Sequence, residues 1–151
     1  MIERERRFLV DAVPGELPVP SHIVQAYITT GRISVRIRRE GDRHTLTLKS
    51  GSGRNRVEIE RPLDRVEFDA LWPDAAELRI DKRRHRVDLG GGLVAELDLF
   101  DGSLAGHRLV EVEFDTDADA DAFVAPSWFG REVTDDSRYT NSSLARRGWP
   151  E

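Results

Sequence analysis

The sequence predicts a mainly β fold with small helices (α+β), built as an eight-stranded antiparallel β-barrel that closes on itself. In seven short segments charged residues recur at every second position, with apolar residues at many of the positions between them. Because successive side chains of a strand point to opposite faces, each segment has one charged and one apolar face. So many strands in a chain of 151 residues favour a closed barrel, which removes exposed edges and turns the charged face inward.

The composition predicts one domain over residues 1–151. Hydrophobic residues make up 38% of the chain, which is enough for a core, and the formal net charge of −5 argues against a nucleic acid polymer as partner. The chain has no cysteine, so disulfides and thiolate metal sites are excluded. It has no apolar run near the roughly 20 residues of a membrane span and does not open like a signal peptide. A cytoplasmic protein without membrane contact is therefore expected.

The strands follow one another through tight turns. Three prolines in residues 11–22 indicate a loop after the first strand, and Gly41-Asp42 makes a hairpin turn between the third and the fourth. Gly90-Gly91-Gly92 marks another turn in the second half of the chain. The eight strands are expected at residues 2–10, 23–29, 33–40, 43–49, 54–61, 77–89, 92–100 and 107–115.

Three short helices are expected between or after the strands. Asp64 can cap a helix over 64–71, which Pro73 is expected to end. An acidic helix is expected over 117–125, and a last one over 141–147.

Two pairs of carboxylates stand out near the ends of the chain. Glu3 and Glu5 share a strand face, and Glu111 and Glu113 repeat that spacing. Carboxylate oxygens suit a hard divalent cation such as Mg²⁺ or Mn²⁺, and closure of the barrel could bring the two pairs together. The alternative is a set of solvated, ion-paired strands without a metal.

A second group of residues supplies positive charge to the same inward face. Arginine binds phosphate oxygens bidentately, while lysine acts as a point charge. The alternative is a set of cross-strand salt bridges with Glu58, Glu60, Glu96 and Asp98, and both roles are compatible. The group consists of Arg36, Arg38, Lys49, Arg56, Lys82 and Arg84.

In this order and spacing the segments resemble the CYTH domain, or triphosphate tunnel metalloenzyme, family, in its short bacterial form. The resemblance starts at Glu3-x-Glu5-x-Arg7, which Phe8-Leu9-Val10 follows, and runs nearly to the end of the chain. The further segments are Gln25-Ala26-Tyr27-Ile28, Val35-Arg36-Ile37-Arg38, Leu46-Thr47-Leu48-Lys49-Ser50, Arg56-x-Glu58-x-Glu60, Lys82-x-Arg84, Glu96-x-Asp98, Glu111-x-Glu113-Phe114, Glu132-Val133-Thr134 and Tyr139-x-Asn141.

The resemblance implies an eight-stranded antiparallel tunnel that acts on a small molecule with a triphosphate group, with Mg²⁺ or Mn²⁺. It implies metal binding by Glu3, Glu5, Glu111 and Glu113, and it places Glu58, Glu60 and Asp98 near a second metal or the attacking water. The residues implied to bind the phosphate chain, as substrate contacts, are Arg7, Arg36, Arg38, Lys49, Arg56, Lys82 and Arg84.

The reaction that we expect is hydrolysis of a linear triphosphate, with inorganic tripolyphosphate as substrate. Tyr27 favours it, because short bacterial phosphatases of the family have a tyrosine there. The sequence leaves other reactions open: cyclisation of ATP, hydrolysis of thiamine triphosphate or a nucleoside triphosphate, and binding of polyphosphate or a nucleotide without turnover. It also leaves the oligomeric state open, a homodimer included.

The chain departs from the family pattern at two positions. Arg7 stands where the motif has lysine, and a guanidinium cannot serve as a general base, although it can still contact phosphate or the leaving group in catalysis. His85 stands where many relatives have an aromatic residue. By alternation it faces away from Arg84, so a packing role is expected for it.

Overall fold

The computed structural model describes residues 1–151 and contains nine strands and three α-helices. None of the helices has the length and apolar character needed to cross a membrane. The strands are β1 (Ile2–Val10), β2 (Ser21–Thr29), β3 (Ile33–Glu40), β4 (Arg43–Ser50), β5 (Asn55–Pro62), β6 (Arg79–Gly90), β7 (Leu93–Phe100), β8 (Arg108–Glu113) and β9 (Phe129–Glu132). The helices are α1 (Arg65–Ala75), α2 (Asp117–Ala122) and α3 (Asn141–Arg147), with 3₁₀ turns η1 (Ala76–Leu78), η2 (Gly102–Leu104) and η3 (Ser137–Tyr139).

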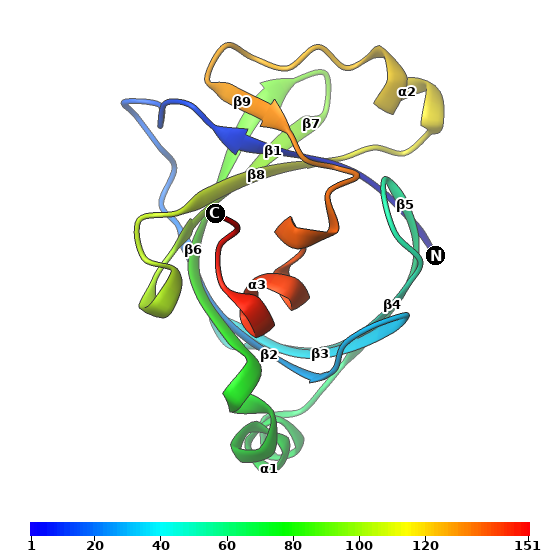
Figure 1. Ribbon diagram of the computed structural model, residues 1–151, viewed down its shortest axis with the longest axis vertical. Helices are drawn as coiled ribbons and strands as arrows, with labels where there is room; N and C mark the ends of the chain where they lie inside the picture. The colour runs from blue at the N-terminus through cyan, green and yellow to red at the C-terminus, as the bar shows by residue number, and fades with distance from the viewer.

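Eight of the strands form the predicted closed antiparallel barrel (Figure 1). Their order around it is β5-β4-β3-β2-β6-β7-β8-β1, and β1 returns to β5. The closure uses the start of β1, where Glu3 lies opposite Arg56 in the antiparallel register. Beyond that point the same strand pairs with β8, which places Glu5 opposite Glu113 and Arg7 opposite Glu111. Closure thus brings the two carboxylate pairs of the sequence onto neighbouring strands.

A ninth strand, β9, was not predicted. It is four residues long and pairs with the end of β1, where Phe8 lies opposite Glu132 and Val10 opposite Phe129. The register shifts between these two pairs. Such a short and irregular strand has no alternating pattern that the sequence could reveal, although it provides the buried ring of Phe129.

Helix α1 begins as predicted but does not stop at Pro73. Asp64 caps it with a capping box, since its carboxylate accepts from the Glu67 amide and the Glu67 side chain accepts from the Asp64 amide. The expectation that Pro73 ends the helix is wrong, because α1 continues to Ala75. Proline inside a helix removes one hydrogen bond and crowds the carbonyl four residues earlier, at a cost of about 3 kcal/mol. Burial of Phe68 and Ala75 against the barrel favours the helical path on both sides of it.

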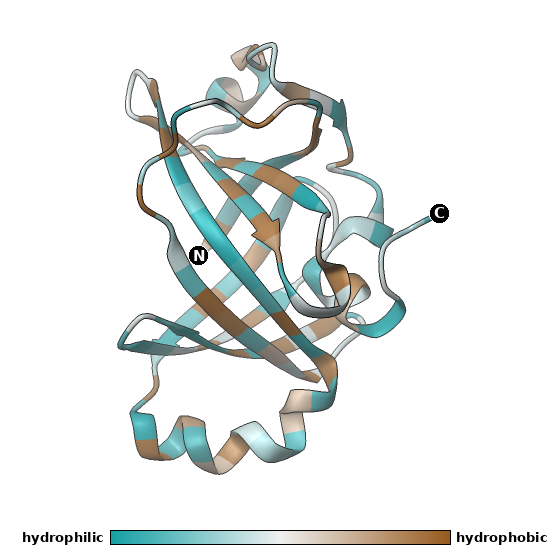
Figure 2. Ribbon diagram, turned by 90° about the vertical axis from the view of Figure 1, so that its left-hand side faces the viewer, coloured by the Kyte–Doolittle hydropathy of each residue, from teal (hydrophilic) through white to brown (hydrophobic).

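Two of the three hydrophobic clusters lie on the outer face of the barrel wall. One joins β1, β7 and β8 to β9 and α2, and the other joins β2 and β3 to α1. Figure 2 shows the pattern behind this arrangement, in which hydrophilic and hydrophobic residues follow one another along the strands. Because the outward apolar faces are covered by these elements, the inward faces need not supply the whole core.

The third hydrophobic cluster fills part of the barrel interior at one end. Ile80, Phe100 and Leu109 lie on the same strand faces as Lys82, Asp98 and Glu111, and they pack against Tyr139 of η3 and Leu144 of α3. In Figure 1 this segment lies within the outline of the barrel. The C-terminal segment therefore closes part of this end and brings the start of α3 to the charged interior.

Candidate metal and anion site in the barrel

The interior holds a cavity of about 260 Å³ whose lining is almost wholly polar. Of the 24 residues that line it, nine are cationic, eight are carboxylates, and Tyr27 is the single hydrophobic one. Every predicted site residue except Asp98 lines this cavity. They are Glu3, Glu5, Arg7, Arg36, Arg38, Lys49, Arg56, Glu58, Glu60, Lys82, Arg84, Glu111 and Glu113.

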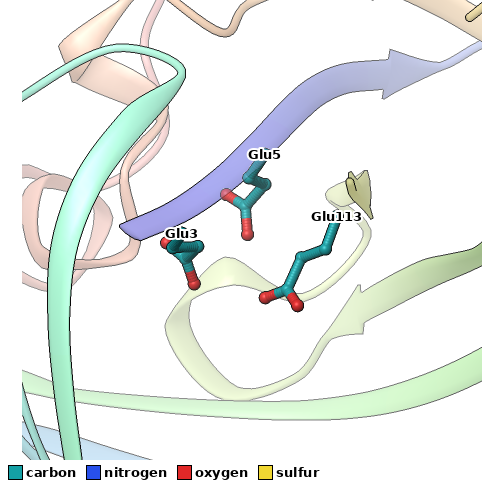
Figure 3. Close-up of side chains that lie close together, drawn as sticks. All are labelled: Glu3, Glu5 and Glu113. Atoms are coloured by element: carbon teal, nitrogen blue, oxygen red, sulfur yellow. The ribbon is translucent and has the colours of Figure 1, made fainter. Parts of the chain in front are cut away.

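Three of the four predicted metal ligands form a compact cluster. Carboxylate oxygens of Glu3, Glu5 and Glu113 lie within 4.8 Å of one another, and Figure 3 shows their side chains converging from β1 and β8. At that distance each charged pair repels by about 3–4 kcal/mol at an effective dielectric constant of about 20. Burial and the neighbouring Glu3 and Glu96 raise the pKa of Glu113 to about 7. An all-oxygen donor set of this kind fits a hard divalent cation.

The fourth predicted ligand, Glu111, lies beside this cluster and contacts cations. Its carboxylate is 3.3 Å from Nη2 of Arg7 and 3.7 Å from Nη2 of Arg84. Burial and the adjacent Glu111 raise the pKa of Glu5. Burial disfavours ionisation of Glu111 as well, but Arg7, a hydrogen bond with Glu5, and the cations Arg84 and Lys82 together outweigh it and lower the pKa of Glu111. The structure thus keeps Glu111 charged as the partner of Arg7.

Arg7 is a buried and permanent cation between two carboxylates. Its Nη2 donates to Oε1 of Glu5 at 2.8 Å and to Oε2 of Glu111 at 3.3 Å. Burial opposes its charge, but Glu111 and Glu5 more than compensate and raise its pKa. Its Nε is buried without a hydrogen-bond partner and so remains free for an acceptor that enters the cavity.

Two other cations near the site neutralise Glu3. Nζ of Lys49 donates to both oxygens of Glu3, at 2.9 and 3.0 Å, and Nη2 of Arg56 lies 3.4 Å from one of them. Burial would raise the pKa of Glu3, but Lys49, a hydrogen bond with Glu58, and Arg56 lower it to about 2. Lys49 also lies 3.4 Å from Oε2 of Glu58, which is one of the predicted cross-strand salt bridges.

Arg36 and Arg38 are the cations whose charge is least compensated. The nearest carboxylate oxygen to Arg36 belongs to Glu60, at 3.9 Å, and the Arg36 Nε has no hydrogen-bond partner. Arg38 forms no ion pair, and its Nε donates to the neutral Gln25 side chain at 2.9 Å. Burial, with Arg36 and Arg84 nearby, lowers the pKa of Arg38 to about 10. Buried cations in this state attract an anion.

Asp98 lies on the inner face of β7 without lining the cavity, and it holds two of the predicted phosphate-binding residues. Its carboxylate accepts from Nζ of Lys82 at 2.6 Å and from Nε and Nη2 of Arg84 at 2.7 and 2.8 Å. Asp98 and Lys82 are both fully buried. Burial lowers the pKa of Lys82 to about 7, although Asp98 opposes this. Asp98 therefore fixes the two cations without facing the cavity.

The two remaining predicted carboxylates reach the cavity from β5. Glu58 lies 3.4 Å from Lys49 Nζ, and burial together with Glu3 raises its pKa. Glu60 accepts from Oγ1 of Thr47 at 3.1 Å and from Arg43 at 3.3 Å. Both carboxylates line the cavity and carry acceptor oxygens there.

The sequence interpretation missed polar residues that complete the wall. Asn141, the first residue of α3, accepts from Lys82 at 3.0 Å and from Gln25 at 3.3 Å. The hydroxyl of Thr47 lies between Arg36, at 3.2 Å, and Glu60. Strand alternation with Lys49 could have identified Thr47. Asn141 belongs to the Tyr139-x-Asn141 segment of the family resemblance but was given no role, because only η3 and α3 bring it into the barrel.

Two residues singled out in the sequence lie on opposite sides of the wall. Tyr27 lines the cavity, and its hydroxyl accepts from Gln25 at 3.3 Å. His85 faces outward, as alternation predicts, and its Nδ1 donates to the carbonyl of Pro18 at 2.7 Å. It packs against the proline-rich loop.

The closed antiparallel barrel with a charged interior matches the triphosphate tunnel fold, and comparison with known sequences identifies the family. A profile of the CYTH domain family matches residues 1–148. This chain belongs to the CYTH domain family.

Two relatives and a solved structure are similar over most of the chain. A Nitrosomonas europaea protein named inorganic triphosphatase is 45% identical over 149 residues, which cover 96% of this chain and 97% of that protein. An inorganic triphosphatase of Acetivibrio thermocellus is 36% identical over 115 residues, 75% of this chain and 72% of that one. A crystal structure of an inorganic triphosphatase has a TM-score of 0.69 and 42% identity, and the match covers 95% of this chain and 93% of that one.

Proposed function

We propose that this chain hydrolyses inorganic tripolyphosphate with Mg²⁺ or Mn²⁺. One observation carries the proposal: a single polar cavity contains both a cluster of three carboxylates and buried cations with free donor groups. The relatives named inorganic triphosphatase support the same substrate. A nucleotide would also bring a base into the tunnel, where Tyr27 is the only hydrophobic lining residue.

Glu3, Glu5 and Glu113 are the residues that would hold the cation. They provide oxygen donors within a small volume, and their mutual repulsion is relieved when a positive charge lies between them. Such an ion would supply Lewis-acid polarisation of a phosphoryl oxygen and would lower the pKa of water. Glu111 would join the set from its position beside Arg7.

The arginines and lysines would bind and neutralise the phosphate chain. Arg36 and Arg38, which are only weakly paired, and the free Nε of Arg7 would provide the first contacts. Their guanidinium groups stay protonated throughout the reaction, so they bind and stabilise negative charge but take up no proton. Lys49, Arg56, Lys82 and Arg84 would add further contacts along the cavity.

The remaining carboxylates would orient the other participants. Glu58 and Glu60 would accept a hydrogen bond from the water that attacks a terminal phosphorus. Asp98 would act as a positioning residue, because it holds Lys82 and Arg84 and does not itself line the cavity.

Phosphate release from tripolyphosphate, ATP and thiamine triphosphate tests the proposal. We expect tripolyphosphate to be the preferred substrate, with Mg²⁺ or Mn²⁺ required and chelator abolishing turnover. Arg38→Ala should reduce activity strongly, while Arg39→Ala, which changes the next residue on the exposed face, is the matched control. Cyclic AMP formation from ATP would instead identify a cyclase, and tight binding of tripolyphosphate without turnover would identify a binding protein.

A further inference from the structure

A second cavity, which we call the vestibule, opens from the first beside α3. It has a volume of about 650 Å³ and no hydrophobic residue in its lining. Six residues line both cavities, so the two are adjacent: Arg7, Ser34, Lys49, Arg56, Thr140 and Ser142. The turns between β2 and β3 and between β4 and β5 form its rim, where Gly31 and Gly51–Gly53 lie. The α3 arginines Arg146 and Arg147 complete it.

The vestibule carries an excess of positive charge. Five cations line it, Asp135 is its single carboxylate, and the remaining polar residues are serines and threonines. Arg7, Lys49 and Arg56 pair with glutamates of the central cavity, so the unpaired charge lies on Arg146 and Arg147. Arg146 makes one side-chain hydrogen bond, from Nη1 to Oγ1 of Thr30 at 3.2 Å, so its other guanidinium nitrogens are free. Guanidinium and hydroxyl donors on a surface without apolar groups are suited to phosphate oxygens.

The opposite mouth of the barrel has the reverse charge. A cavity there is lined by six carboxylates and three arginines, and five of the six residues that it shares with the central cavity are glutamates. Strand β1 runs between the two mouths, with Glu3 in the acidic one and Arg7 in the vestibule. A polyanion longer than the central cavity is therefore repelled at one mouth and attracted at the other.

From this asymmetry, and on the basis of the function proposed above, we propose that the vestibule is a second anion subsite. It binds the phosphates that project past Lys49 and Arg56 when the ligand is a linear inorganic polyphosphate of more than three phosphates. The chain extends toward Arg146 and Arg147 and not toward the acidic mouth. A nucleoside gains no affinity from the vestibule, because the vestibule has no aromatic face on which a base could stack.

The test compares ligands that differ only in length. Hydrolysis of tripolyphosphate by the wild-type protein is measured in the presence of a competitor, which is either a linear polyphosphate of eight phosphates or ATP. We expect the octaphosphate to bind more tightly than tripolyphosphate. ATP should show no such gain in affinity. In the double variant Arg146→Ala/Arg147→Ala the inhibition constant of the octaphosphate should rise about tenfold, since each exposed cation contributes modestly. The KM and kcat of tripolyphosphate should stay within about twofold.

A second double variant controls for net charge. Arg39→Ala/Arg65→Ala removes two exposed arginines from the outside of the barrel and should leave both ligands unaffected. The proposal is overturned if Arg146→Ala/Arg147→Ala weakens both ligands equally, or neither. Failure of the proposed function would look different, because wild-type protein would then not hydrolyse tripolyphosphate. Calorimetric titration with the octaphosphate would still test the vestibule in that case.

Discussion

Removal of the Asp98 charge should destabilise this protein more than any other conservative change of a single carboxylate. Asp98→Asn keeps the volume and polarity of the side chain but removes the negative charge between Lys82 and Arg84. Asp98 and Lys82 are fully buried, and the Arg84 side chain is 7% exposed. Three short hydrogen bonds, at 2.6, 2.7 and 2.8 Å, lose their anionic acceptor.

The size of the effect follows from the cost of an uncompensated buried charge. Removal of one partner of a buried ion pair lowers the free energy of unfolding by about 3–5 kcal/mol. For a protein of this size each kcal/mol shifts the melting temperature by about 2–4 °C. We therefore expect Asp98→Asn to lower the melting temperature by roughly 6–20 °C at neutral pH. Asn141 and Glu96, which also contact the two cations, keep the loss from being larger.

The loss should also depend on pH, because Lys82 titrates. Burial lowers its pKa to about 7 from the ordinary value of 10.5, so between these values the unfolded chain binds a proton that the folded one lacks. This group therefore makes the wild-type protein more stable as pH rises from 7 toward 10.5. Without Asp98 the pKa of Lys82 falls further, so the penalty should be about 1 kcal/mol larger at pH 6 than at pH 9.

Thermal and urea unfolding of wild type and variant at pH 6, 7.5 and 9 measure both effects. Asp101→Asn is the matched control, because Asp101 pairs with the exposed Arg83 and should contribute less than about 1 kcal/mol. A melting temperature for Asp98→Asn within 2 °C of the wild type, about the effect of 1 kcal/mol, would refute the reasoning, since it would mean that Lys82 and Arg84 do not depend on Asp98 for compensation.

The other predictions concern the cavity. Glu5→Gln and Glu113→Gln should each abolish phosphate release from tripolyphosphate while the far-ultraviolet circular dichroism stays unchanged; full activity in excess chelator would contradict the metal site. Arg7→Lys should change the rate modestly and Arg7→Ala should lower kcat about 10²–10³-fold, as expected for a lost charge-assisted contact; a large gain on Arg7→Lys would show that the position needs a titratable amine. Tripolyphosphate with Mg²⁺ at 100 times its dissociation constant should stabilise the fold by about 2.7 kcal/mol, visible as a rise in melting temperature; no rise would argue against a triphosphate site.

Strand alternation is the reason why most of the fold was predictable. A period of two assigned Arg36, Arg38 and Lys49 to the inner face before any register was known, and the structure places all three in the cavity. Closure could be predicted because an open sheet with these faces would leave edges exposed. The short strand β9 and the passage of α1 through Pro73 were not predictable, because tertiary packing of Phe129, Phe68 and Ala75 decides both.

The sequence predicted which residues lie in the candidate site, but it did not predict which of them pair with one another. Spacing alone makes Glu111 and Glu113 equivalent, yet the register places Glu111 opposite Arg7 and Glu113 opposite Glu5. One carboxylate therefore binds a guanidinium, and the other joins the cluster of three. Asp98 shows the same limit of the sequence pattern. It shares the inner face with Glu96, but it is fully buried and pairs with Lys82 and Arg84.

The position of the hydrophobic clusters explains how a small barrel can keep a charged interior. A barrel of eight strands normally fills its interior with side chains. Here α1, α2 and β9 bury apolar area on the outer face, and η3 and α3 fill one end, so stability comes mainly from outside the cavity. Nine cations and eight carboxylates can then share the interior, nearly neutral as a whole. Arg36 and Arg38 remain poorly paired. An anion that enters the cavity can therefore bind these two cations without first breaking a strong ion pair.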